Sequence, residues 1–125
     1  MYRVLIAEDE ARIASFMHKG LSKAGYEASV VSSGTAALEA VLTNNFHLVL
    51  LDLGLPGLSG DAVLKNLRSQ QIGCPVLVVT ARPEDAPESK DIQPLANGWV
   101  NKPFKMKDLL QHIENLLPTD SSTPN

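Results

Sequence analysis

Carboxylates, a hydroxyl and an ammonium group follow the short apolar runs of this 125-residue chain, each at the point where a run ends. These polar residues are Glu8, Asp9, Asp52, Thr80 and Lys102. One Asp at such a point is readily explained as a turn cap, because Asp side chains accept hydrogen bonds from nearby backbone N–H groups. The repetition at several run ends points instead to a shared site.

Three of these residues are acids, and clustered carboxylates raise one another's pKa unless a cation joins them. A small set of oxygen ligands, with water filling the remaining positions, suits Mg²⁺. We therefore expect Glu8, Asp9 and Asp52 to form a magnesium site. Asp9 and Asp52 are expected as direct ligands, and Glu8 is expected to act through water.

The remaining groups suit a phosphoryl group attached to Asp52. Lys102 supplies a positive charge with three donors, and Thr80 supplies a hydroxyl donor. Asp52 would be the nucleophile, the metal would neutralise phosphoryl oxygens, and Lys102 and Thr80 would hold the others. Such a site would act by positioning and electrostatics.

Strands and helices are expected to alternate along the chain. Unbroken apolar runs predict strands covered on both faces, at residues 2–7, 28–31, 46–52, 75–80 and 99–101. Apolar residues at helical spacing predict helices at residues 10–24, 34–43, 60–69 and 105–117. This order predicts an α/β fold with a doubly wound parallel sheet, in which ligands bind beyond the carboxyl ends of the strands. The five polar residues should therefore meet at one edge of the sheet.

The segment 81–98 breaks the helical pattern. It contains Pro83, Pro87 and Pro94 and few apolar residues. Proline removes a helix donor and clashes with the preceding turn. We therefore expect the fourth helix to be short or irregular, or replaced mostly by loop.

Composition and length exclude several classes of protein. The net charge of -3 argues against direct nucleic acid binding through a basic face, and the single cysteine excludes an internal disulfide. No signal peptide is apparent, and no apolar run is long enough to cross a membrane. We expect a cytoplasmic protein with one domain at 1–118, and a disordered tail or linker stub at 119–125.

Four sequence motifs, in order and with their spacing intact, resemble the receiver domain of a two-component response regulator: VLIAEDE, LVLLDLGLPGLSG, PVLVVTA and NKPF. The resemblance covers residues 2–117. It implies a flavodoxin-like (βα)5 fold with strand order 2-1-3-4-5 and a cis Lys102–Pro103 bond. It also implies Mg²⁺-dependent phosphorylation of Asp52 by a sensor histidine kinase or histidine phosphotransfer protein. The chain would then be a phosphoacceptor with slow self-catalysed phosphotransfer and dephosphorylation, rather than an enzyme.

The resemblance also suggests how phosphorylation would be reported to a downstream protein effector. Thr80 matches the switch hydroxyl, and Trp99 matches a switch aromatic that turns inward when Thr80 moves toward the phosphoryl group. Trp99 could equally be an ordinary amphipathic aromatic on an edge strand. Asn97 and His112 replace charged residues that build a symmetric dimer in many relatives, so we do not expect that dimer.

Three other functions are alternatives for a chain with this order of elements. A dinucleotide- or flavin-binding module would need a glycine-rich loop after the first strand, where this chain has AEDEAR. An aspartyl phosphatase or mutase would carry a second Asp at the position of Gly54. The third alternative is a receiver-fold interaction module that is never phosphorylated. The sequence leaves open the cognate kinase, the signal, the output and the oligomeric state.

Overall fold

A five-stranded parallel sheet with the order β2-β1-β3-β4-β5 forms the centre of the computed structural model, which describes residues 1–117. Its strands are β1 (Arg3–Ala7), β2 (Glu27–Val31), β3 (Leu48–Leu51), β4 (Val76–Thr80) and β5 (Gly98–Asn101). The predicted fold and strand order are therefore confirmed. The tail predicted at 119–125 lies outside the described residues.

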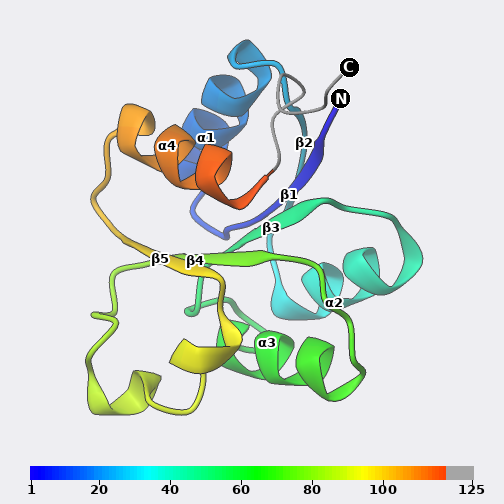
Figure 1. Ribbon diagram of the computed structural model, residues 1–125, viewed down its shortest axis with the longest axis vertical. Helices are drawn as coiled ribbons and strands as arrows, with labels where there is room; N and C mark the ends of the chain where they lie inside the picture. The colour runs from blue at the N-terminus through cyan, green and yellow to red at the C-terminus, as the bar shows by residue number, and fades with distance from the viewer. Residues whose placement is uncertain (118–125) are drawn as a thin grey trace.

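Helices cover both faces of this sheet. Helices α1 (Ala11–Lys23) and α4 (Met106–Leu116) lie on one face, and α2 (Gly34–Thr43) and α3 (Gly60–Ser69) lie on the other (Figure 1). Within the described residues, no helix is both long and apolar enough to cross a bilayer.

Side chains alternate between the two faces along the central strands, as the pleat of a strand requires. Val4 and Ile6 of β1 pack in the core beneath α1 and α4, whereas Leu5 and Ala7 pack beneath α2 and α3. The two faces therefore carry two hydrophobic cores. Burial on both faces explains why the central strands are continuous apolar runs.

Serine side chains cap two of the helices at the residue before the predicted start of each. Ser33 accepts a hydrogen bond from the Ala36 N–H at 3.1 Å at the start of α2. Ser59 accepts one from the Ala62 N–H at 3.2 Å at the start of α3. Each cap satisfies a backbone donor that lacks a partner within its helix.

Two expectations of burial were wrong. Strand β2, predicted to be covered on both faces, lies at the edge of the sheet and leaves Val30 41% exposed. In α1, Phe16 is one of the apolar residues whose helical spacing predicts this helix and an inward face, but it is 49% exposed, with its ring 6.1 Å from that of Phe104. A sequence pattern gives the spacing of apolar residues, but strand order decides which strand has only one neighbour.

The proline-rich segment forms two short 3₁₀ turns instead of a regular fourth helix, which confirms the prediction. These turns are η1 (Pro87–Ser89) and η2 (Gln93–Leu95). The buried Ile92 anchors the segment in the core beneath α2 and α3, and the buried Ser89 hydroxyl donates to the Pro83 carbonyl at 2.9 Å. The segment connects β4 to β5 and runs beside α3 (Figure 1).

Candidate functional site

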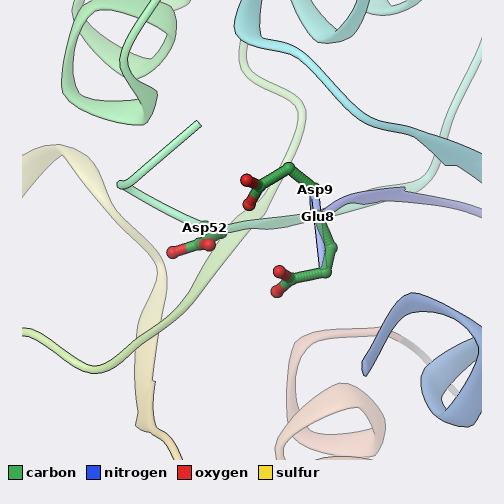
Figure 2. Close-up of side chains that lie close together, drawn as sticks. All are labelled: Glu8, Asp9 and Asp52. Atoms are coloured by element: carbon green, nitrogen blue, oxygen red, sulfur yellow. The ribbon is translucent and has the colours of Figure 1, made fainter. Parts of the chain in front are cut away.

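Three carboxylates gather at the carboxyl edge of the sheet. Glu8 and Asp9 follow the end of β1, and Asp52 follows the adjacent strand β3 (Figure 2). One oxygen from each lies within 4.8 Å of the other two. The structure therefore brings together the acids that the sequence predicts for a magnesium site.

The donor set fits Mg²⁺ chemically, because all three groups offer hard oxygen ligands and carry more negative charge than one nearby lysine neutralises. Glu8 Oε2 accepts the Glu10 N–H at 3.1 Å, so this side chain also fixes the backbone before α1. Glu8 is buried, whereas Asp9 is exposed at the rim.

Lys102 reaches this cluster from beyond the end of β5. Its Nζ lies 2.6 Å from Glu8 Oε1 and 3.2 Å from Asp52 Oδ2. Glu10 Oε1 is farther away, at 3.8 Å. The peptide bond between Lys102 and Pro103 is cis, as the resemblance implied.

The pKa values of Glu8 and Lys102 are both raised above their ordinary values. Burial raises the pKa of Glu8, and the hydrogen bond from Lys102 only partly opposes that shift. Burial would lower the pKa of Lys102, but Glu8 and Asp52 outweigh it, so the pKa lies above its ordinary value. Lys102 therefore remains a cation beside Asp52.

The carboxylate of Asp52 is held by groups on both sides. Oδ2 faces Lys102, and Oδ1 accepts the Gly54 N–H at 3.2 Å, so the turn-capping role also holds. The side chain is 11% exposed, so a small part of it is in contact with solvent. Capping and a chemical role are thus compatible in one residue.

Thr80 ends β4, and Trp99 lies on the neighbouring strand β5. The Thr80 hydroxyl accepts the Arg82 N–H at 3.4 Å. The Trp99 indole Nε1 donates to the Arg82 carbonyl at 3.0 Å, and its ring packs in the core beneath α2 and α3. Both residues therefore meet at Arg82.

Comparison with protein families decides the assignment of the chain. The family model for the response regulator receiver domain matches residues 4–114 of the chain. The chain belongs to the response regulator receiver domains. Receiver domains are phosphorelay signalling domains rather than classical enzymes, and the alternative of a module that is never phosphorylated is not favoured.

Curated relatives of this receiver domain include regulators of transcription. The chain is 39% identical over 114 residues to the uncharacterised transcriptional regulatory protein YkoG of Bacillus subtilis, covering 91% of the chain and 50% of the relative. It is 36% identical over 114 residues to the response regulator PmrA of Pseudomonas aeruginosa, covering 91% of the chain and 52% of the relative. The receiver domain therefore spans about half the length of these relatives.

Solved receiver domains have the same fold. The receiver domain of the Francisella response regulator 1452 superposes with a TM-score of 0.85 at 30% identity, covering 93% of this chain and 96% of that one. The Thermotoga maritima response regulator TrrA, solved in complex with Mg²⁺-BeF, gives 0.84 at 29% identity, covering 94% and 100%.

Two arginines form contacts at this receiver domain that the sequence did not reveal. Arg82 pairs with Asp61, and Arg68 donates to the carbonyls of Ile72, Cys74 and Leu95 and to Asn97 Oδ1. Asn97 Oδ1 also accepts the Val76 N–H at 2.9 Å, so this exposed residue links Arg68 to the start of β4. No motif marks either arginine, because each finds its partners only after folding.

Proposed function

We propose that Asp52 of this receiver domain accepts a phosphoryl group from a phosphohistidine of a sensor histidine kinase or histidine phosphotransfer protein. The observation that supports this most strongly is the position of the Lys102 ammonium, 3.2 Å from Asp52 Oδ2 within a cluster of three carboxylates. A fixed cation beside one carboxylate oxygen stabilises charge that moves onto that group. The other members of the cluster provide oxygen ligands for a metal.

In the proposed reaction, an Asp52 carboxylate oxygen forms a bond to phosphorus as the phosphorus–nitrogen bond of the phosphohistidine breaks. The electron pair of that bond leaves with the imidazole, and Asp52 becomes an acyl phosphate. Lys102 faces the carboxylate throughout and can donate to a phosphoryl oxygen. The protein contributes position and charge rather than a second nucleophile.

Mg²⁺ would be held by Asp9 and Asp52, with Glu8 acting through water. This division is supported by the contacts of Glu8, whose two oxygens are already engaged by the Glu10 N–H and by Lys102. When bound, the metal supplies positive charge that neutralises phosphoryl oxygens. The exposed Asp9 leaves the rim of the site open to a hydrated ion.

Thr80 and Trp99 would form the switch that reports phosphorylation. Thr80 accepts its hydrogen bond from Arg82, so its own hydroxyl hydrogen remains to donate. We propose that this hydrogen turns to a phosphoryl oxygen, and that the movement reaches a surface recognised by a downstream protein. Slow self-catalysed dephosphorylation by water would reset the domain in the cytoplasm.

A further proposal concerns the output of this receiver domain. Relatives of twice this length include proteins named as transcriptional regulators, so we propose that the receiver controls a DNA-binding segment. Direct nucleic acid binding is not expected of this chain itself, because its net charge is -3.

Acetyl phosphate with Mg²⁺ tests the proposal without knowledge of the kinase. Intact mass spectrometry should show a gain of one phosphate in the wild-type chain and none in Asp52→Asn. The exposed Asp85→Asn serves as the matched control and should gain the phosphate normally. A wild-type chain that gains no phosphate with acetyl phosphate or any phosphohistidine donor would favour an interaction module instead.

A further inference from the structure

Arg82 is bound through its backbone to both proposed switch residues. Its N–H donates to the Thr80 hydroxyl at 3.4 Å. Its carbonyl accepts two hydrogen bonds from β5, one from Trp99 Nε1 at 3.0 Å and one from Asn101 Nδ2 at 2.8 Å. A movement of Thr80 therefore acts on the same residue that holds the Trp99 indole.

The side chain of Arg82 is fixed to a different element. Its guanidinium forms a two-pronged pair with Asp61 of α3, with nitrogen–oxygen distances of 2.7 and 3.1 Å. Asp61 is 23% exposed and Arg82 28% exposed, so solvent screens the pair only in part. Paired hydrogen bonds between a guanidinium and a carboxylate fix orientation as well as distance.

Asp61 lies where α3 meets the backbone of Asp52. Gly60, the residue before it, donates its N–H to the Leu53 carbonyl at 3.0 Å. A side chain at position 60 would collide with the backbone of Asp52 and Leu53, so the first turn of α3 lies directly against Asp52. The Asp61–Arg82 pair thus links the turn beside Asp52 to the loop that follows Thr80.

We propose that Asp61 and Arg82 are positioning residues that couple phosphorylation of Asp52 to the state of the Trp99 indole. This inference rests on the proposed phosphorylation of Asp52. The added phosphoryl group accepts a hydrogen bond from the Thr80 hydroxyl. It also crowds the first turn of α3. Because the Asp61–Arg82 pair holds these two segments together, their movement displaces the Arg82 carbonyl and changes the acceptor of the Trp99 N–H.

Trp99 is the only tryptophan in the chain, so intrinsic fluorescence reports on this indole alone. Wild type, Asp61→Asn and Arg82→Gln are treated with acetyl phosphate and Mg²⁺, and the phosphate on each is measured by mass spectrometry. We expect equal phosphorylation in all three. The fluorescence change on phosphorylation should fall at least threefold in both variants.

Three further variants separate coupling from general damage. Asp108→Asn removes an exposed carboxylate from the first turn of α4 and should keep the full fluorescence change. Asp61→Glu keeps the carboxylate and should recover at least half of the wild-type fluorescence change. The double variant Asp61→Asn/Arg82→Gln should lose no more than either single variant, because the two residues act as one pair.

The outcomes distinguish this inference from the proposed function. A full fluorescence change in phosphorylated Asp61→Asn would overturn the coupling role, as would a wild type that is phosphorylated with no change at Trp99. Either result would leave phosphorylation of Asp52 intact. A wild type that gains no phosphate would refute the proposed function itself, and the coupling with it.

Discussion

The ammonium of Lys102 lies closer to Glu8 than to Asp52, at 2.6 Å from Glu8 Oε1 and 3.2 Å from Asp52 Oδ2. The lysine therefore has two tasks in the unphosphorylated domain. It compensates a carboxylate that is almost entirely buried, and it places a positive charge beside Asp52. Glu8 in turn holds Lys102 at the site.

Replacement of Lys102 by methionine should destabilise the domain in the absence of divalent ions. The change removes the cation between Glu8 and Asp52, whose side chains are 1% and 11% exposed. Loss of one partner from a buried ion pair costs about 3 kcal/mol in the free energy of unfolding. Urea unfolding in EDTA measures this, with the exposed Lys107→Met as the control. A loss no greater than in the control would show that the pair contributes little.

Magnesium should stabilise the wild-type domain and have little effect on Asp9→Asn. The three clustered carboxylates repel one another, and a bound divalent ion favours the folded state that assembles them. At ten times its Kd, a ligand specific for the folded state adds about 1.4 kcal/mol to the free energy of unfolding. Thermal unfolding with Mg²⁺ or EDTA tests this, and equal gains in both proteins would exclude Asp9 from the metal site.

Glu8 should make the stability of the metal-free domain depend on pH. Burial raises its pKa above the ordinary value of 4.5, so the folded state holds this proton more tightly than the unfolded state. Its contribution is fully present below pH 4.5 and is lost as the pH rises through the folded pKa. The unfolding free energy of Glu8→Gln minus that of wild type should therefore increase with pH across this interval. Urea unfolding in EDTA at several pH values checks the sign, and a decreasing difference would contradict it.

Replacement of Arg68 by alanine should destabilise the domain without preventing phosphorylation of Asp52. Arg68 joins the end of α3 to the segments before β4 and β5, through bonds to three carbonyls and Asn97 Oδ1. We expect a loss of roughly 2–4 kcal/mol in the free energy of unfolding, because partly buried acceptors lose a charged donor. Urea unfolding measures the loss, and the exposed Lys65→Ala is the control. A change below about 1 kcal/mol would show that water replaces these bonds readily.

The residue pattern alone predicted the order of the elements and the identity of the acidic cluster. Apolar runs ending in polar residues could be placed at one sheet edge, because parallel strands in a doubly wound sheet present their carboxyl ends together. Helices α2 and α3 have the predicted bounds, since Ser33 and Ser59 mark their starts. These features depend on local spacing and on a general rule of topology.

Other features depended on which distant segments came into contact. The sequence did not show that Lys102 would lie closest to Glu8, that Arg82 would join Asp61 to Trp99, or that Asn97 would accept a hydrogen bond from Arg68. The strand order implied by the resemblance placed β2 at the edge of the sheet, but the apolar run at 28–31 did not show that most residues of this strand would be exposed. Charge pairing and exposure are set by the distances between side chains from different elements, and those distances exist only once the sheet and helices have packed. The sequence thus determined which groups were present at the site, and tertiary packing decided which of them touch.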